Sequence, residues 1–472
     1  MTSPQVPVPR PYRVAVIGSG PSGLYTAEAL LEGDPDVQVD VFDRLPAPYG
    51  LVRYGVAPDH LKMKSVIRAL VSTFDDADRV RFLGNVHVGD AAGGGAVPPE
   101  VLREHYHAVV HATGSAIDRD LGIPGERLAG SVGSGAFVSW YCGHPDAAGP
   151  GPALDRAGAV VVGAGNVAID VARILARPAD DLAATDLHDA VLDRLRDSAV
   201  TDVHVLVRRG PQHVRFTPAE LRALGKLDDV EIRVHDDGIL AAGVEEPAER
   251  RMRQVLETLT EWAADPPGAG GRRRIHLRFL RSPVRLVGDV GDGDGSGRVR
   301  AIEIERNEIA PDGSVRGTGE TSLLETGLVV RAIGYAGEPV PGLPFDGAGG
   351  TVPHEAGRVV LGGEPLRGSY VTGWIKRGPT GVIGTNKGDG AETAASLLAD
   401  LPGLATPPRP GGDAVLDRLR EFGVDPVLWE DWQRLDAAEI ALGQRRGGTD
   451  RVKIAERTAM LDAARGTRTG GR

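Results

Sequence analysis

The chain of 472 residues contains a single cysteine, Cys142, and this shortage excludes several kinds of chemistry. One thiol cannot form an internal disulfide, a redox-active Cys-x-x-Cys pair or a cysteine-ligated iron–sulfur cluster. Disulfide reductases, which need two cysteines, are excluded on the same ground. Any redox reaction of this protein must therefore run on a bound organic cofactor.

Long apolar runs and an excess of positive charge are also missing. No apolar run reaches the roughly 18 residues that cross a bilayer, and the first ten residues lack the apolar core of a signal peptide. We therefore expect a cytoplasmic protein without membrane contact. The net charge of −11 argues against nucleic-acid binding. Hydrophobic residues at 41% are typical of a globular protein, and the length suffices for two or three domains.

Glycine, in contrast, is abundant at 65 residues, and the first glycine-rich segment is GSGPSG. It follows a strand-like run at 13–17 and precedes a helical pattern at 22–31, the context of a dinucleotide-binding turn. A second strand, 37–42, ends in Asp43, about 20 residues beyond the last glycine, where a carboxylate accepts ribose hydroxyls. The pattern predicts an FAD site, whose turn residues are Gly18, Gly20, Ser22 and Gly23.

A second segment, GAGNVA, follows the apolar run 160–162 and precedes a helical pattern at 167–176. The next strand, 202–207, ends in Arg208 and Arg209 instead of an acid. Planar guanidinium groups suit the 2′-phosphate of NADPH. We therefore predict an NADPH site whose turn residues are Gly163, Gly165, Asn166, Val167 and Ala168. Two different nucleotide sites imply electron transfer between two cofactors.

These patterns predict an α/β protein with two Rossmann-like, three-layer dinucleotide-binding domains. The FAD-binding domain is expected to be discontinuous, at 1–115 and 327–472, with a helical tail at 413–464. The NADP-binding domain would be inserted at 116–326. The apolar run that ends in Ala112, Thr113 and Gly114 closes the first unit. A similar run at 327–335 is interpreted as the return to the first domain.

Several longer motifs resemble one family closely. They are GSGPSG, PYGLVRYGVAPDH at 48–60, ATG at 112–114, GNVAIDVARIL at 165–175, RRGPQHVRFTPAEL at 208–221 and GWIKRGPTGVIGTNK at 373–387. Together they resemble the adrenodoxin-reductase-type, actinobacterial FprA-like branch of the ferredoxin–NADP reductases. The resemblance implies a glutathione-reductase-like FAD domain with an inserted NADP domain. The FAD contacts that it implies are Ser22, Asp43, Leu51, Trp374, Gly381, Val382 and Ile383. The NADP contacts that it implies are Arg119, residues 165–168, Arg208, Arg209, Glu220 and Gly381.

His60 is the one group in the 48–60 motif that titrates near neutral pH. The resemblance places it near the flavin, where it either relays a proton or shapes the nicotinamide pocket. Some family members pair this histidine with a glutamate three residues after Glu220. That position is Ala223 here, which argues against such a pair. Glu220 itself is expected to hold a ribose or to pair with an arginine.

The resemblance implies an NADPH:ferredoxin oxidoreductase that receives a hydride on FAD and passes single electrons to an iron–sulfur protein. We expect a small acidic ferredoxin as partner, a monomeric enzyme and no metal ion. Two alternatives are an NADPH diaphorase or flavin oxidase, and an electron-relay subunit of a larger complex. The candidate docking cations are Arg53, Lys62, Lys64, Arg68, Lys376 and Arg377.

Overall fold

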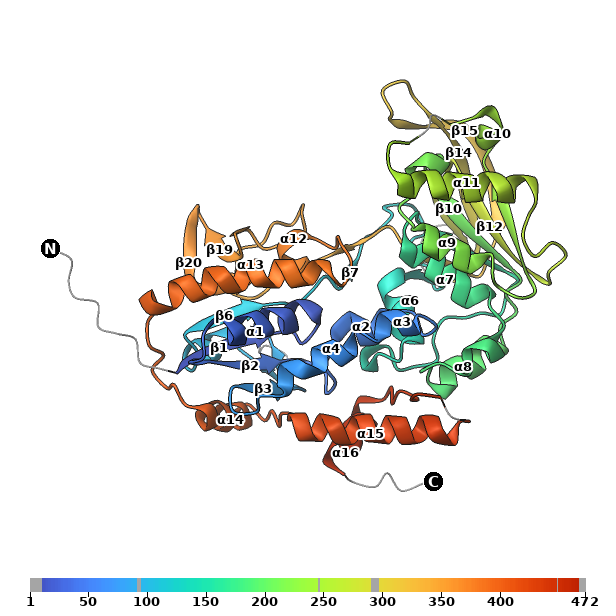
Figure 1. Ribbon diagram of the computed structural model, residues 1–472. Coiled ribbons are helices and arrows are strands. Elements are labelled where there is room, and N and C mark those ends of the chain that lie inside the picture. The colour runs from blue at the N-terminus through green and yellow to red at the C-terminus, as the bar shows by residue number, and fades with distance from the viewer. Residues whose placement is uncertain (1–10, 91–94, 245–246, 290–296, 448, 467–472) are drawn as a thin grey trace.

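The computed structural model describes residues 11–90, 95–244, 247–289, 297–447 and 449–466. Two α/β units lie side by side, each built on its own mainly parallel sheet (Figure 1). A helical segment near the C-terminus runs along both of them. Among the described helices, none has the length and apolarity that a membrane span requires.

The first unit is built on a seven-stranded sheet of order β18-β19-β20-β6-β1-β2-β3. The strands from β20 to β3 pair in parallel, whereas β18 and β19 are antiparallel. Helices α1 and α13 pack on one face, and α5 and α14 pack on the other. The strands are β1 (Tyr12–Ile17), β2 (Val37–Phe42), β3 (Val80–Leu83), β6 (Ala108–His111), β18 (His354–Glu355), β19 (Arg358–Leu361) and β20 (Glu364–Val371). The helices are α1 (Pro21–Gly33), α5 (Pro99–Arg103), α13 (Thr385–Asp400) and α14 (Gly412–Glu421).

The second unit is built on a six-stranded parallel sheet of order β11-β12-β10-β9-β16-β8. A three-stranded antiparallel sheet, β13-β14-β15, covers one face, and helices α7, α9 and α11 cover the other. The strands are β8 (Ser131–Gly133), β9 (Gly158–Val162), β10 (Asp202–Val207), β11 (Val230–His235), β12 (Arg273–Phe279), β13 (Arg281–Gly288), β14 (Val299–Ile309), β15 (Val315–Glu325) and β16 (Leu328–Arg331). The helices are α6 (Ser134–Tyr141), α7 (Asn166–Ala176), α8 (Asp189–Arg196), α9 (Pro218–Leu224), α10 (Ile239–Ala242) and α11 (Arg250–Ala264).

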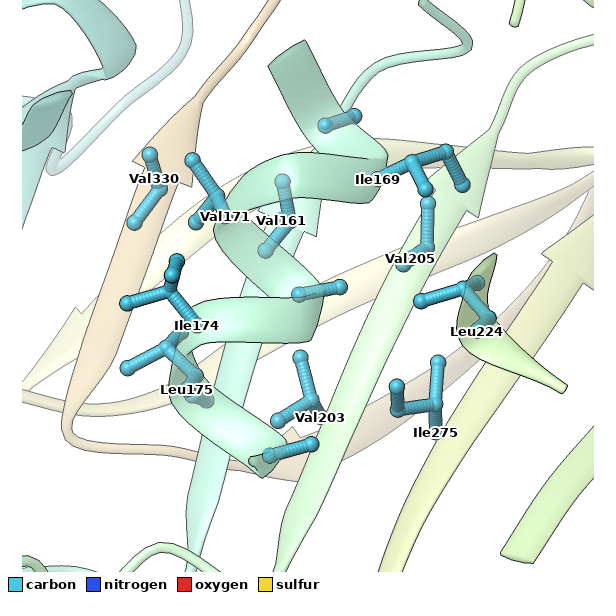
Figure 2. Close-up of a cluster of buried hydrophobic side chains, with 14 of the residues drawn as sticks. Val161, Ile169, Val171, Ile174, Leu175, Val203, Val205, Leu224, Ile275 and Val330 are labelled. Carbon is cyan, nitrogen blue, oxygen red and sulfur yellow. The ribbon is translucent and has the colours of Figure 1, made fainter. Parts of the chain in front are cut away.

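Helix α7 lies at the centre of the larger hydrophobic core (Figure 2). Its apolar side chains, among them Ile169 and Ile174, pack against valines of β9, β10 and β16. Strands buried on both faces are continuous apolar runs, as in the Val-rich β9. The core thereby fixes the start of α7 directly after the second glycine-rich turn, and it leaves Asp170 and Arg173 on another side of the helix.

The predicted domain boundary at 327 is wrong by one strand. Strand β16 pairs with β9 and β8, so it belongs to the second sheet. The sequences 327–335 and 109–114 are similar because β16 and β6 hold equivalent positions in the two sheets, and not because both belong to the first sheet. The chain returns to the first sheet after β17 (Tyr335–Ala336), which pairs with β7 (Ile117–Asp118). The division into two cofactor domains stays a prediction.

Short elements connect the two units. Helices α2 (Gly50–Tyr54), α3 (Leu61–Lys64) and α4 (Ile67–Val71) follow β2, and α12 (Trp374–Arg377) follows β20. Strands β4 (His87–Val88) and β5 (Ala96–Val97) form a small separate pair. The tail contains α15 (Trp429–Arg445) and α16 (Arg457–Arg465), whose Trp432 and Met460 are buried in the core of the first unit.

Beyond α15, the tail also contacts the second unit. Arg446 donates hydrogen bonds to the carbonyl oxygens of Thr185 and Leu187 and pairs with Asp189. Lys453, which is 2% exposed, lies 3.1 Å from the carboxylate of Asp186. The tail is therefore bound to both units at once.

Candidate functional site

The first glycine-rich turn connects β1 to α1 and is shaped by close packing on one side. A Cβ at Gly18 would collide with the carbonyl oxygen of Ala112, and one at Gly23 would collide with that of Gly18. At Gly20 the nearest atom to a Cβ would be Cα of Gly50, 3.9 Å away. A dinucleotide site requires this arrangement, with closely packed outer glycines and a middle glycine that a pyrophosphate can approach. The start of α1 adds free backbone N–H groups.

The second turn repeats this design between β9 and α7. A Cβ at Gly163 would collide with the carbonyl oxygen of Ala332, the counterpart of Ala112 in the second sheet. A Cβ at Gly165 would have no neighbour within 4 Å. Ala168 takes the third glycine position and is fully buried against β9 and β10. The chain therefore offers two places that fit a pyrophosphate, at the carboxyl ends of two separate sheets.

Asp43 is fixed beside the first turn. Its Oδ2 accepts hydrogen bonds from the backbone N–H of Ser19 at 3.0 Å and from the Ser19 hydroxyl at 2.5 Å, and its Oδ1 accepts one from Leu45 N–H at 2.9 Å. Burial raises the pKa of the Asp43 carboxyl, although the hydrogen bonds from Ser19 and Leu45 oppose that rise. A carboxylate in this position suits the ribose hydroxyls of a nucleotide.

Arg208 and Arg209 stand at the end of β10, the position that Asp43 has in the first sheet. Hydrogen bonds from Asn307 and Leu280 to their carbonyl oxygens fix the backbone. Their guanidinium groups make no ion pair with the carboxylates of the described residues, and Arg208 is exposed. This end of the second sheet thus carries unpaired positive charge where the first sheet carries a carboxylate.

Exposed apolar side chains border the first turn. Leu51 is 48% exposed and Val382 is 71% exposed, although both lie in glycine-rich segments close to buried residues. Ser22 donates a hydrogen bond to Asn386 at 2.8 Å, which joins the first turn to the start of α13. Gly381 has a φ of +85°, and Ile383 packs against the core of the first unit. A flat apolar ligand would cover Leu51 and Val382.

Trp374 is half-buried and stacks against the ring of Tyr335, with centroids 6.3 Å apart. Tyr335 follows the second-sheet strand β16, so this ring pair connects the two units. The carbonyl oxygen of Tyr335 accepts a hydrogen bond from Nε of the exposed Arg119 at 3.1 Å, and Gly334 O accepts one from Arg119 N–H. Arg119 thereby lies beside the turn that follows β16 and contains Ala332. In the first unit, Thr113 and Gly114 belong to the corresponding turn, which follows β6.

An ion cluster joins the two units at His60, which we call the His60 cluster. It contains His60 and Asp59 from the first unit and Asp170, Arg173 and Glu220 from the second. Arg173 is 2% exposed and donates to Asp59 from Nε and Nη2, at 2.8 and 2.9 Å. Its Nη1 lies 2.8 Å from Asp170 and 3.3 Å from Glu220. Nε2 of His60 lies 3.0 Å from Asp170 and 3.1 Å from Glu220.

The expectation from Ala223 that His60 lacks a glutamate partner is therefore wrong. Glu220 itself reaches the imidazole from the first turn of α9, where Thr217 caps the helix by accepting a hydrogen bond from Glu220 N–H. The expectation that Glu220 pairs with an arginine is confirmed by its contact with Arg173. Its predicted contact with NADP stays a prediction.

The carboxylates set the protonation of His60. Burial lowers the pKa of the imidazole, but the hydrogen bonds to Asp170 and Glu220 and the charge of Asp170 outweigh burial and raise it to about 9. Nη2 of Arg173 lies 2.7 Å from the same ring nitrogen, which can accept a hydrogen bond from it only when the ring is neutral. Charge balance favours the protonated ring.

The ligand atoms of His60, Asp170 and Glu220 lie within 4.8 Å of one another, a spacing that a metal ion can use. Arg173 contacts all three residues and supplies the positive charge between them. Among the described residues no other such group of potential ligands occurs. We therefore interpret the cluster as an arginine-centred ion network.

Two of the six predicted docking cations are wrong. Arg53 and Lys376 are 4% and 5% exposed and pair with Glu439 at 2.5 Å and with Asp389 at 2.8 Å, so neither can face a partner protein. Their burial was not visible in the sequence, because their partners lie 386 and 13 positions away.

Two further cations, Lys64 and Arg377, are half-buried and already paired with Asp186 and Asp389. Lys62 and Arg68 are exposed and make no ion pair with the described residues. They remain candidates for docking.

Comparison with known proteins agrees with this geometry. Residues 12–226 match the family model for pyridine nucleotide-disulphide oxidoreductases. The chain is 42% identical over 470 residues to NADPH-ferredoxin reductase FprA of Mycobacterium tuberculosis, with 96% of this chain and 99% of that protein covered. It is 39% identical over 462 residues to the mitochondrial NADPH:adrenodoxin oxidoreductase of Mus musculus, with 95% and 91% covered.

The solved structure of Mycobacterium tuberculosis FprA in complex with NADPH matches this structure with a TM-score of 0.88 and 41% identity, over 96% of this chain and all of that one. The fold is therefore shared along nearly the whole length. The chain belongs to the family of FAD-dependent oxidoreductases that contains the NADPH–ferredoxin reductases and the NADPH:adrenodoxin oxidoreductases.

Proposed function

We propose that this protein is an FAD-dependent NADPH:ferredoxin oxidoreductase. The observation that carries the proposal is the chemical difference between two otherwise matching turns. In the first unit, β2 is followed by a fixed carboxylate, Asp43. In the second unit, β10 is followed by Arg208 and Arg209, whose guanidinium groups make no ion pair with the described residues. A carboxylate suits a ribose and repels a phosphate, whereas guanidinium groups bind a 2′-phosphate.

The chain's own residues would bind and orient two ring systems. The first turn, with Asp43 and the exposed Leu51 and Val382, would hold FAD, and the second turn would hold NADPH. When both are bound, the nicotinamide supplies a hydride and the flavin accepts it and releases electrons singly. Transfer of a hydride needs close approach, at about 3–3.5 Å between the reacting atoms, and no covalent catalyst.

The His60 cluster would hold the two units in the orientation that this approach requires. Its contacts cross between the units, from Asp59 and His60 to Arg173 and Glu220. His60 carries a proton on Nε2 that it shares with Asp170 and Glu220. We propose that His60 acts first as a positioning residue, and that proton relay is a second role of the same side chain.

The electron acceptor would be a small acidic iron–sulfur protein. With one cysteine, the chain cannot hold a cysteine-ligated cluster of its own, so single electrons must leave to a partner. The relatives are named for ferredoxin and adrenodoxin. Lys62 and Arg68 are the exposed cations that we propose for docking, since a local positive patch attracts an acidic partner in spite of the net charge of −11.

Anaerobic titration tests the proposal directly. The purified protein should be yellow, and NADPH should bleach the flavin absorbance faster than NADH at equal concentration. Faster bleaching by NADH would contradict the assignment of Arg208 and Arg209. Reduction of cytochrome c should depend on added ferredoxin and should fall as salt is raised, because the contact is electrostatic.

Two alternative functions give different results in the same assays. Cytochrome c reduction that is indifferent to ferredoxin would favour a diaphorase or flavin oxidase. Elution in gel filtration as part of a larger complex would favour an electron-relay subunit, whereas we propose a monomeric, cytoplasmic enzyme.

A further inference from the structure

The loop after β10 carries more unpaired positive charge than the pair Arg208 and Arg209. Arg215 is also exposed, and its guanidinium makes no hydrogen bond or ion pair with the described residues. The positive charge of Arg209 contributes, after burial, to a lowered pKa of the nearby His213. Several like charges on one loop repel each other unless an anion joins them.

The backbone brings both ends of this loop to the same turn. Strand β10 runs parallel to β9 with Leu206 beside Val162, and Gly163 N–H donates to the carbonyl oxygen of Leu206 at 3.0 Å, so the loop that begins at Arg208 starts beside the second turn. The loop then returns, and Arg215 N–H donates to the carbonyl oxygen of Ala164 at 2.7 Å. Arg208 and Arg215 therefore stand at the two ends of a loop that begins and returns beside the second turn.

Two further contacts hold the returning segment in place. Asn166 Oδ1 accepts a hydrogen bond from Thr217 N–H at 2.8 Å, and Nη2 of Arg251 donates to the carbonyl oxygen of Arg215 at 2.6 Å. Arg251 thereby adds another guanidinium beside the loop. The adjacent Gly165 faces open space, with nothing within 4 Å of the place that a Cβ would take.

We propose that Arg215 is a third ligand of the 2′-phosphate of NADPH, together with Arg208 and Arg209. The proposal rests on the proposed function, since it names a further residue of the same NADPH site. A phosphate monoester carries a charge of about −1.5 to −2 at neutral pH and offers three acceptor oxygens. Planar guanidinium groups bind such oxygens in pairs of hydrogen bonds, so one phosphate can be shared among three arginines. Arg215 would therefore contribute to the choice of NADPH over NADH.

Calorimetric binding of two nucleotides to the FAD-loaded protein tests Arg215 without turnover. 2′,5′-ADP carries one phosphate at the 2′ position and one at the 5′ position, and 5′-AMP is the same nucleotide without the 2′-phosphate. Arg215→Gln should weaken binding of 2′,5′-ADP about tenfold and leave binding of 5′-AMP unchanged, because only a charge-assisted contact to the 2′-phosphate is lost. Arg316→Gln is the matched control, since Arg316 is an exposed arginine of the same unit on β15. It should change neither affinity.

A steady-state measurement with ferricyanide as acceptor gives a second readout. Arg215→Gln should raise KM for NADPH about tenfold and leave kcat unchanged. Unchanged binding of 2′,5′-ADP, or equal weakening of both nucleotides, would overturn the role of Arg215 and leave the proposed function standing. Wild-type protein that binds 2′,5′-ADP no more tightly than 5′-AMP would overturn the NADPH assignment itself.

Discussion

Replacement of Arg173 by methionine should destabilise the protein strongly. Methionine has a similar length but removes the guanidinium that joins Asp59, Asp170 and Glu220. The change leaves three carboxylates in a largely buried place with His60 and Arg177 as their remaining cationic neighbours. Burial of a charge without its partner costs several kcal/mol, which is more than the intact pair contributes.

The size of the loss follows from what remains around the carboxylates. Breaking a buried pair costs about 3–5 kcal/mol in general. Asp59 keeps Arg177 at 3.0 Å, and the side chains of Asp59 and Asp170 are 10% and 15% exposed, so water can reach both. We therefore expect the lower end of that range, about 3 kcal/mol of unfolding free energy.

Guanidinium chloride unfolding followed by tryptophan fluorescence would measure this loss. The matched control is Arg196→Met, which removes another arginine of the second unit with two acidic partners, Asp180 and Asp193. Those partners are exposed, so no measurable loss is expected.

A double-mutant cycle with Asp59→Asn isolates the coupling across the two units. It should give at least about 1 kcal/mol between Arg173 and Asp59, because the two side chains touch. A loss for Arg173→Met no larger than that of Arg196→Met, or a coupling near zero, would refute the idea that the His60 cluster joins the units.

Three further predictions concern pH, the glycine-rich turns and the tail. Burial lowers the pKa of His204 to about 3, so the contribution of this group to stability is complete above pH 6.5 and is lost as pH falls. The free energy of unfolding measured at pH 7 should therefore exceed that at pH 5 by about 2 kcal/mol from His204. His204→Gln should reduce this difference. His60, with a raised pKa of about 9, has the opposite sign: its contribution is complete below pH 6.5 and disappears as pH rises through 9, and His60→Gln should flatten that alkaline loss. Gly23→Ala should yield protein that purifies without yellow colour, because its Cβ collides with Gly18, whereas Gly165→Ala, which meets no protein atom, should keep its flavin and lose only NADPH affinity. Lys453→Met should selectively speed amide hydrogen exchange in the tail around residue 453, because Asp186 then has only Lys64 as an ion-pair partner and no longer binds the tail. Unchanged exchange in this segment would contradict the role of Lys453 in anchoring the tail.

Local sequence patterns predicted the two nucleotide-binding units well. The strands 37–42 and 202–207 coincide with β2 and β10, and α7 begins one residue before its predicted start. These elements are set by short-range signals, such as β-branched runs and glycine turns. Helix α11 lies outside these motifs and was not predicted, although its Val255, Leu259 and Trp262 have helical spacing.

Contacts between distant segments could not be predicted from one sequence. The His60 cluster joins positions 59 and 60 to 170, 173 and 220, which lie more than 100 residues further along the chain. Arg53 and Lys376 were interpreted as surface cations because their acidic partners approach only in the folded chain. The two similar runs before Gly114 and Gly334 could not be assigned to their sheets without the strand pairing.

The double attachment of the tail sets an order for folding. Lys453 and Arg457 bind Asp186 and Asp146 of the second unit, and Lys453 also binds the carbonyl oxygen of Arg53 of the first. Both residues leave the ribosome after every strand of both sheets. Each sheet can therefore complete its own hydrogen bonding while the chain is still growing. The tail adds its contacts only afterwards, to units that the His60 cluster already joins. A nascent chain halted before residue 446 would therefore contain two formed sheets that the tail has not yet fastened together.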